Sequence, residues 1–335
     1  MRKIEFFIMA LLSCLFFNIE ASGQGNGNGI MKSRQQEFAK WKYGAFLHFN
    51  MGTFHDKEWV TGYEDPLSFN PTSNIDCNQW MKVIKAAGMK YAVLTVKHTG
   101  GWCLWDSKYT THDIASFKNY KNGKGDIVRD FVNACRKHGI KVGFYYCMPG
   151  DYSGNSLNGR TDLHGLPLEA QGDYSGFIKK QMTELLTNYG KIDLLWVDQT
   201  QNRYTAKDWV DLLNTIHGLQ PGCVVVANNE HSYEKTDVCS YEYNYFKKVD
   251  MNQALPKAGN GNVSEVSDCI DATDRWFWHT GEKGVKSVDA IVGMLRMCNE
   301  RSTNYLLDIP AGRDGKISPL YSNQLKNIWK KYTGK

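Results

Sequence analysis

The stretch that decides the fold is KIDLLWVDQT, residues 191–200. From Ile192 to Val197 it is apolar apart from Asp193, the composition of a strand buried on both faces, and it ends on Asp198. A carboxylate at the end of such a strand has two interpretations. It is either an ordinary exit from the core, as a strand end or helix cap, or part of a site shared with the ends of other strands.

Similar apolar runs recur along the chain and alternate with segments of helical periodicity. Residues 43–49, 91–97, 141–147 and 223–228 are also apolar on both faces, as parallel strands require. Between two of them, residues 126–139 carry their apolar side chains on one stripe, with Asp126 as a start signal and Gly139 as a stop signal. This repeated order of strand and helix predicts a parallel sheet with right-handed crossovers.

Three weaker candidate strands, residues 237–243, 275–279 and 305–310, bring the number to eight. Eight parallel strands in about 300 residues predict a single (β/α)8 TIM-like barrel in the α/β class, somewhat irregular in its last strands and helices. A doubly wound sheet is the alternative. It is disfavoured because no predicted strand is followed by a glycine-rich nucleotide-binding loop.

The amino-terminal segment has the pattern of a secretory signal peptide. Arg2 and Lys3 precede an apolar stretch over residues 6–17, and small residues follow at Ala21 and Gly23. Cys14 offers a lipoprotein acylation site as an alternative, disfavoured because apolar residues continue beyond it. We therefore expect a signal peptide at 1–23, a flexible linker at 24–35 and a catalytic barrel at 36–335, in a protein exported to the periplasm or beyond the cell.

The composition of the chain argues against several kinds of binding partner. The 40 basic and 35 acidic residues are spread without blocks, which argues against nucleic-acid binding, and no later apolar run is long enough to span a membrane. The eight cysteines beyond the signal segment form no CxxC pair and no His/Cys cluster, so neither zinc nor another cofactor is expected. Isolated buried thiols are favoured over a disulfide framework.

Polar and aromatic residues gather at the predicted strand ends, where a barrel places its chemistry. They are His48, His98, Tyr145, Tyr146, Asp198, Glu230, Glu242, Trp276 and Trp278. Two carboxylates among imidazoles and rings, without metal-ligand spacing, suit hydrolysis of a glycosidic bond, and the rings suit stacking against a sugar. A serine hydrolase is disfavoured because no GxSxG motif is present.

These motifs resemble glycoside hydrolase family 29, the retaining α-L-fucosidases. The resemblance lies in residues 42–71, 86–110, 125–147, 185–199 and 304–317, and so runs over nearly the whole chain beyond residue 36. The details HFNMGTF (48–54) and WFWH (276–279) resemble the branch that acts on α-1,3/1,4-linked fucose. Because the last of these segments lies close to residue 335, we expect the barrel without the C-terminal β-sandwich that many members carry.

The resemblance implies roles for individual residues. Asp198 matches the nucleophile, and Glu242 is chosen as the general acid/base, with Glu230, Glu234 and Glu265 as rivals. Glu265 is also the leading candidate for a substrate contact. The positions that match the fucose pocket are His48, Glu58, Trp59, His98, Tyr146, Trp196 and Trp276.

The implied function is exo-acting hydrolysis of terminal α-L-fucose from oligosaccharides or glycoprotein glycans by double displacement. Burial is expected to raise the pKa of Glu242 so that it can act as an acid. Two departures from the family pattern bear on this. KHTGGW (97–102) has Thr99 where the family has a second histidine, and WVDQ (196–199) has Gln199 where glycine is usual. Hydrolysis of a fucose-like sugar, such as an α-L-galactoside, and an inactive glycan-binding barrel are the alternatives.

Overall fold

A computed structural model of the chain shows a closed barrel of eight parallel strands, which confirms the predicted fold class. The structure describes residues 27–60, 62, 64–116, 118–148, 173–200, 205–243, 255–257, 262–282 and 284–335. Each strand pairs with its neighbours in chain order, and the last closes on the first. The strands are β1 (Tyr43–Leu47), β2 (Tyr91–Lys97), β3 (Lys141–Cys147), β4 (Leu194–Asp198), β5 (Val224–Ala227), β6 (Val238–Glu242), β7 (Ser264–Cys269) and β8 (Thr303–Asp308).

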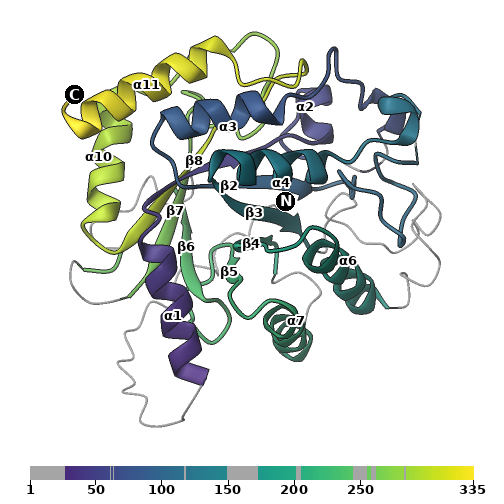
Figure 1. The fold of residues 1–335 in the computed structure, drawn as a ribbon, viewed down its shortest axis with the longest axis horizontal. Helices are drawn as coiled ribbons and strands as arrows, with labels where there is room; N and C mark the ends of the chain where they lie inside the picture. Colours follow the sequence, from purple (N-terminus) through teal and green to yellow (C-terminus); the bar gives the residue numbers. More distant parts are fainter. Residues whose placement is uncertain are drawn as a thin grey trace, which may run out of the picture.

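Helices surround these strands (Figure 1). They are α1 (Gly27–Ala39), α2 (Met51–His55), α3 (Cys77–Ala86), α4 (Ile127–His138), α6 (Tyr174–Asn188), α7 (Ala206–Leu219), α10 (Val288–Asn299) and α11 (Pro319–Thr333), with 3-10 turns at Pro66–Ser68 and Lys121–Gly123. Helix α4 begins and ends at the predicted start and stop residues. Its N-cap is Asp126, whose carboxylate accepts a hydrogen bond from the backbone N–H of Arg129, and it ends at Gly139 in the left-handed conformation.

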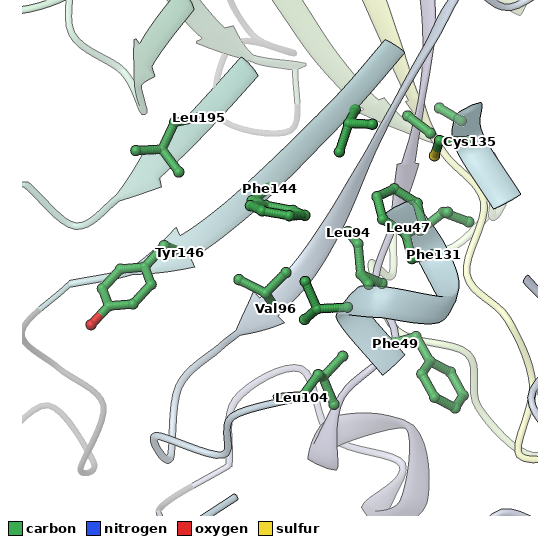
Figure 2. Close-up of a cluster of buried hydrophobic side chains, with 14 of the residues drawn as sticks. Leu47, Phe49, Leu94, Val96, Leu104, Phe131, Cys135, Phe144, Tyr146 and Leu195 are labelled. Carbon is green, nitrogen blue, oxygen red and sulfur yellow. The ribbon is translucent and has the colours of Figure 1, made fainter. Parts of the chain in front are cut away.

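Side chains on β3 and β4 alternate between two apolar layers. One layer lies between barrel and helices: Figure 2 shows Phe144 of β3 and Leu195 of β4 on the same side as Phe131 and Cys135 of α4. The other fills the barrel and includes Phe46, Tyr145 and Trp196. This alternation decides which residues reach the open end of the barrel.

The prediction for the seventh strand was wrong. The strand is Ser264–Cys269, and residues 275–279 lie in the loop that follows it. The sequence SEVSDC is polar, yet it is fully buried. Its two carboxylates find partners inside the protein: Glu265 accepts hydrogen bonds from Tyr91 and Trp196, and Asp268 accepts one from Tyr305. A hydropathy pattern therefore misses this strand.

The predicted linker over residues 24–35 is also corrected, because residues 27–35 belong to helix α1. This helix lies at the amino-terminal end of the barrel, where Arg34 pairs with Asp237 at 2.7 Å and the backbone oxygen of Phe38 accepts a hydrogen bond from Asn304. These tertiary contacts hold the second half of α1, a helix that would be marginal alone. The signal peptide predicted at residues 1–23 lies outside the described residues.

Two further observations concern the state of the cysteines and the length of the apolar helices. All eight cysteines from Cys77 onward are buried, and each is a free thiol in the structure. Among the described residues, no helix combines the length and the apolar character needed to cross a membrane.

Candidate active site

A pocket of about 260 Å3 opens at the carboxyl end of the barrel. It lies where the strand ends converge, the face on which barrels of this type place their functional groups. The lining residues are Phe46, His48, Trp59, His98, Tyr145, Trp196, Asp198, Gln199, Thr200, Asn228, Asn229, Glu242, Ser267 and Trp276. The predicted pocket residues in this set are therefore His48, Trp59, His98, Trp196 and Trp276, together with both predicted catalytic carboxylates.

Asp198 is the last residue of β4, and three donors hold its carboxylate. The Tyr145 hydroxyl donates to Oδ2 at 2.7 Å, while the Asn228 side-chain amide and the backbone N–H of Gln199 donate to Oδ1 at 2.9 and 2.8 Å. These contacts fix the orientation of the carboxylate before any ligand arrives. Such preorganisation is what a nucleophile needs.

Glu242 ends β6 and faces the same pocket. The nitrogen of Asn228 that donates to Asp198 also donates to Oε2 of Glu242 at 3.1 Å. Burial, reinforced by the charge of Asp198 and opposed by the hydrogen bond from Asn228, raises the pKa of Glu242 to about 7. This agrees with the expected effect of burial and lets Glu242 hold a proton near neutrality.

The bridge through Asn228 limits how far apart the two carboxylates lie. Placed end to end, its 2.9 and 3.1 Å hydrogen bonds give the largest separation that Asp198 Oδ1 and Glu242 Oε2 can have. That limit applies to one oxygen of each group, and it makes the two carboxylates neighbours in the pocket.

The three rival glutamates are not brought into the pocket. Glu230 accepts hydrogen bonds from the backbone of His231 and Ser232, and Glu234 is exposed to solvent. Glu265 lies inside the barrel below the pocket, enclosed between the Tyr91 hydroxyl and the Trp196 indole N–H at 2.7 and 2.8 Å. It supports Trp196 from beneath and does not line the pocket.

Two histidines line the pocket, and a neighbour holds each through Nδ1. His48 Nδ1 lies 2.7 Å from Asp308 Oδ1, and His98 Nδ1 lies 3.1 Å from the Thr99 hydroxyl. Burial lowers the pKa of His48 to about 3 and that of His98 well below its ordinary value, and it raises the pKa of Asp308 well above its ordinary value. Both rings are therefore neutral hydrogen-bonding groups at physiological pH.

Tyr146 was predicted in the pocket, and this is wrong. Its hydroxyl points away from the site, to Lys97 and to Gln181 of α6, while its neighbour Tyr145 lines the pocket. The register explains the difference. Tyr145 pairs with Trp196, which shares a strand face with Asp198, so residues of that parity face inward. This parity rule, applied to the sequence, would have selected Tyr145.

Glu58 also lies behind the pocket rather than in its lining. Its carboxylate accepts hydrogen bonds from Arg275 Nε at 3.1 Å and from the backbone N–H of Trp276 at 2.8 Å. It thereby orients the loop that carries Trp276 into the pocket. Asn228 is a pocket residue that was not predicted, although it follows β5 directly and so occupies a strand-end position.

Gln199 occupies a backbone conformation that favours glycine. Its φ of 57° lies in the left-handed region, and its N–H closes onto the Asp198 carboxylate. This explains why glycine is usual here. Gln199 adopts this conformation at some cost in backbone strain, and its side chain forms part of the pocket wall. Among the described residues, no group of three or more His, Cys, Asp or Glu side chains is placed to hold a metal ion.

An eight-stranded parallel barrel with two linked carboxylates, indoles and imidazoles at its carboxyl end defines the class of barrel glycoside hydrolases. The family model described as Alpha-L-fucosidase matches residues 24–334. The chain belongs to this family, glycoside hydrolase family 29.

Individual relatives agree with this assignment. The chain is 31% identical over 336 residues to Alpha-L-fucosidase 1 of Arabidopsis thaliana, covering 90% of this chain but 62% of that protein. The structure of α-L-fucosidase isoenzyme 1 from Paenibacillus thiaminolyticus matches with a TM-score of 0.72 at 27% identity, covering 91% of this chain and 77% of the other. A family 29 structure from an unknown rumen bacterium matches with a TM-score of 0.71 at 29% identity, covering 89% and 56%.

Proposed function

We propose that this protein is an exported, exo-acting α-L-fucosidase that removes terminal α-linked L-fucose from oligosaccharides or glycoprotein glycans with retention of configuration. One observation carries the proposal: Asp198 and Glu242 share the Asn228 amide inside a pocket at the carboxyl end of the barrel. Export rests on the signal pattern of the first 23 residues.

The mechanism is double displacement. Asp198 attacks the anomeric carbon, and protonated Glu242 donates its proton to the leaving oxygen, which leaves a covalent fucosyl-enzyme. Glu242, now ionised, then removes a proton from water, which attacks the same carbon and releases fucose and Asp198. Retention is proposed on the resemblance to the retaining family 29 enzymes, and the shared Asn228 amide, which keeps one oxygen of each carboxylate near the other, is compatible with it.

The pocket suits a single deoxysugar. Its volume of about 260 Å3 lies below the usual range of about 300–1,000 Å3 for ligand pockets, which supports an exo mode of action. His48 and His98 provide nitrogen atoms for hydroxyl groups, while Phe46 and Trp276 provide an apolar wall for the methyl group at C5. Fucose carries both hydroxyl groups and a methyl group, so it matches both parts of the pocket.

The linkage is proposed to be α-1,3 or α-1,4, on the resemblance of HFNMGTF and WFWH to that branch of the family. Trp59 is compatible with a disaccharide substrate. Its indole lines the pocket and is 63% exposed, so it offers an open face at the mouth where the sugar after fucose would lie. A digest of defined α-1,2, α-1,3, α-1,4 and α-1,6 fucosyl oligosaccharides tests this. Release of fucose from only the α-1,2 or α-1,6 compounds would refute the linkage.

The catalytic assignment is tested with Asp198→Ala, Glu242→Gln and the matched control Glu230→Gln. We expect Asp198→Ala to abolish release of nitrophenol from an aryl α-L-fucoside. Glu242→Gln should slow hydrolysis of a fucosyl disaccharide by about 10²–10⁴-fold, the usual contribution of general acid catalysis. Glu230→Gln removes a carboxylate outside the pocket and should retain activity. Wild-type activity in Asp198→Ala would refute the assignment, and binding of fucosides without turnover by the wild type would favour a glycan-binding role.

A further inference from the structure

Thr99, which departs from the family pattern, lies behind His98. The ring of His98 stacks on Tyr145 at 5.4 Å and meets Phe277 edge-on at 4.9 Å. These contacts fix the plane of the imidazole. They do not determine which nitrogen carries the hydrogen, because both tautomers have the same shape.

The hydroxyl of Thr99 determines which nitrogen of His98 carries the hydrogen. Thr99 is buried, and its Oγ1 accepts a hydrogen bond from the backbone N–H of Val60 at 3.2 Å while lying 3.1 Å from His98 Nδ1. The hydroxyl proton also needs an acceptor, since an unpaired buried donor is costly. His98 Nδ1 is the acceptor beside it in the described part of the chain. Thr99 therefore donates to Nδ1, and neutral His98 carries its hydrogen on Nε2.

The turn after Thr99 holds this arrangement in place. Gly100 has a φ of 88°, and a Cβ atom at this position would lie 2.7 Å from Val60 Cγ2. Glycine thus permits a close approach between the loop at Val60 and the turn at residues 98–101. Burial and the neighbouring His48 lower the pKa of His98 well below its ordinary value, which keeps the ring neutral.

We propose that Thr99 is a positioning residue that fixes His98 as an Nε2–H donor, so that the pocket recognises a hydroxyl oxygen of the sugar ring at this point. The inference rests on the proposed function for the identity of the sugar. Thr99 is not part of the pocket lining and acts through His98. The threonine that stands in place of the family's second histidine therefore sets whether His98 donates or accepts in its hydrogen bond to the sugar.

The kinetic test uses Thr99→Val, which has nearly the same shape but no hydroxyl, and Thr99→Ser, which keeps it. We expect Thr99→Val to raise KM for an aryl α-L-fucoside about five- to tenfold, with kcat changed less than about twofold, and Thr99→Ser to restore KM. Thermal unfolding of each variant is measured alongside, because Thr99→Val also leaves the Val60 N–H without its acceptor.

A double-mutant cycle separates positioning from a general structural effect. In a His98→Ala background, Thr99→Val should cause no further rise in KM. An equal rise in both backgrounds would show that Thr99 acts through the Val60 loop, and would overturn the inference.

Nitrogen-15 NMR of the histidine rings provides a readout that does not depend on turnover. The His98 signal, assigned by its loss in His98→Ala, should show a protonated Nε2 and an unprotonated Nδ1. A protonated Nδ1 in wild-type protein would overturn the inference even if the enzyme hydrolyses fucosides. Absence of fucosidase activity with the expected tautomer would instead refute the proposed function alone.

Discussion

The two carboxylates of this site, Asp198 and Glu242, differ in their surroundings. Asp198 is surrounded by three hydrogen-bond donors, whereas Glu242 is buried beside that carboxylate. In the proposed mechanism, the same functional group therefore attacks in one position and donates a proton in the other. Asn228 connects the two and sets their spacing.

The first prediction concerns pH. Burial raises the pKa of Glu242 to about 7, so the carboxyl is protonated below that pH and loses its proton as pH rises. Because the acid form is needed in the first step, kcat/KM for a fucosyl disaccharide should fall as pH rises through about 7. Fluoride leaves without protonation, so α-L-fucosyl fluoride should lose most of this alkaline limb. The same limb with both substrates would assign the titration to another group.

The second prediction compares adjacent tyrosines. Tyr145→Phe removes a donor to the Asp198 carboxylate, whereas Tyr146→Phe removes a hydroxyl directed at Lys97 and Gln181. A hydrogen bond to a charged group contributes about 1.5–3 kcal/mol, so Tyr145→Phe should lower kcat/KM about 10- to 100-fold. Tyr146→Phe should stay within about twofold of wild type. Steady-state kinetics on an aryl fucoside measures both, and the reverse order would contradict the register.

At the scale of elements, local signals were sufficient wherever a segment follows its own pattern. Helix α4 has its predicted cap and stop residues because an N-cap carboxylate and a left-handed glycine satisfy its own backbone groups. Strand β7 has no such signal. Its polar residues are buried because Tyr91, Trp196 and Tyr305 reach it from other strands, and those partners are distant in sequence.

The cap gives the third prediction. Asp126→Ala removes the acceptor for the backbone N–H of Arg129 and should reduce the free energy of unfolding by about 1 kcal/mol. Denaturant unfolding followed by circular dichroism measures the change. Asp211→Ala, an exposed acidic residue in the interior of α7, is the matched control and should change stability by less than about 0.5 kcal/mol. Equal losses would mean that capping does not explain the contribution of Asp126.

At the scale of the whole molecule, the two ends of the barrel have separate tasks. Helix α1 covers the amino-terminal end through Arg34 and Phe38, and the pocket occupies the carboxyl end. Parallel strands make this division possible, because all eight carboxyl ends meet on one face.

The fourth prediction follows from this division. Phe38 is fully buried against Trp41 and Tyr91, so Phe38→Ala should reduce the free energy of unfolding by about 3–5 kcal/mol while leaving KM unchanged below the unfolding temperature. Trp276→Ala removes a pocket wall and should raise KM with a smaller loss of stability. Thermal unfolding and KM, measured on both variants, check the contrast. A changed KM in Phe38→Ala would show that the two ends are coupled.

The sequence by itself determined the barrel class, seven of its strands, helix α4 with its caps, and Asp198 at the end of β4. These features follow from local periodicity and from a residue at a strand end, whereas the choice of Glu242 rested on the family resemblance. Only the tertiary structure decided that β7 is a polar strand, that Tyr145 faces the pocket, and that Glu58 and Glu265 act from behind it. The physical reason is that burial of a polar group depends on hydrogen-bond partners which closure of the barrel brings together from distant parts of the chain.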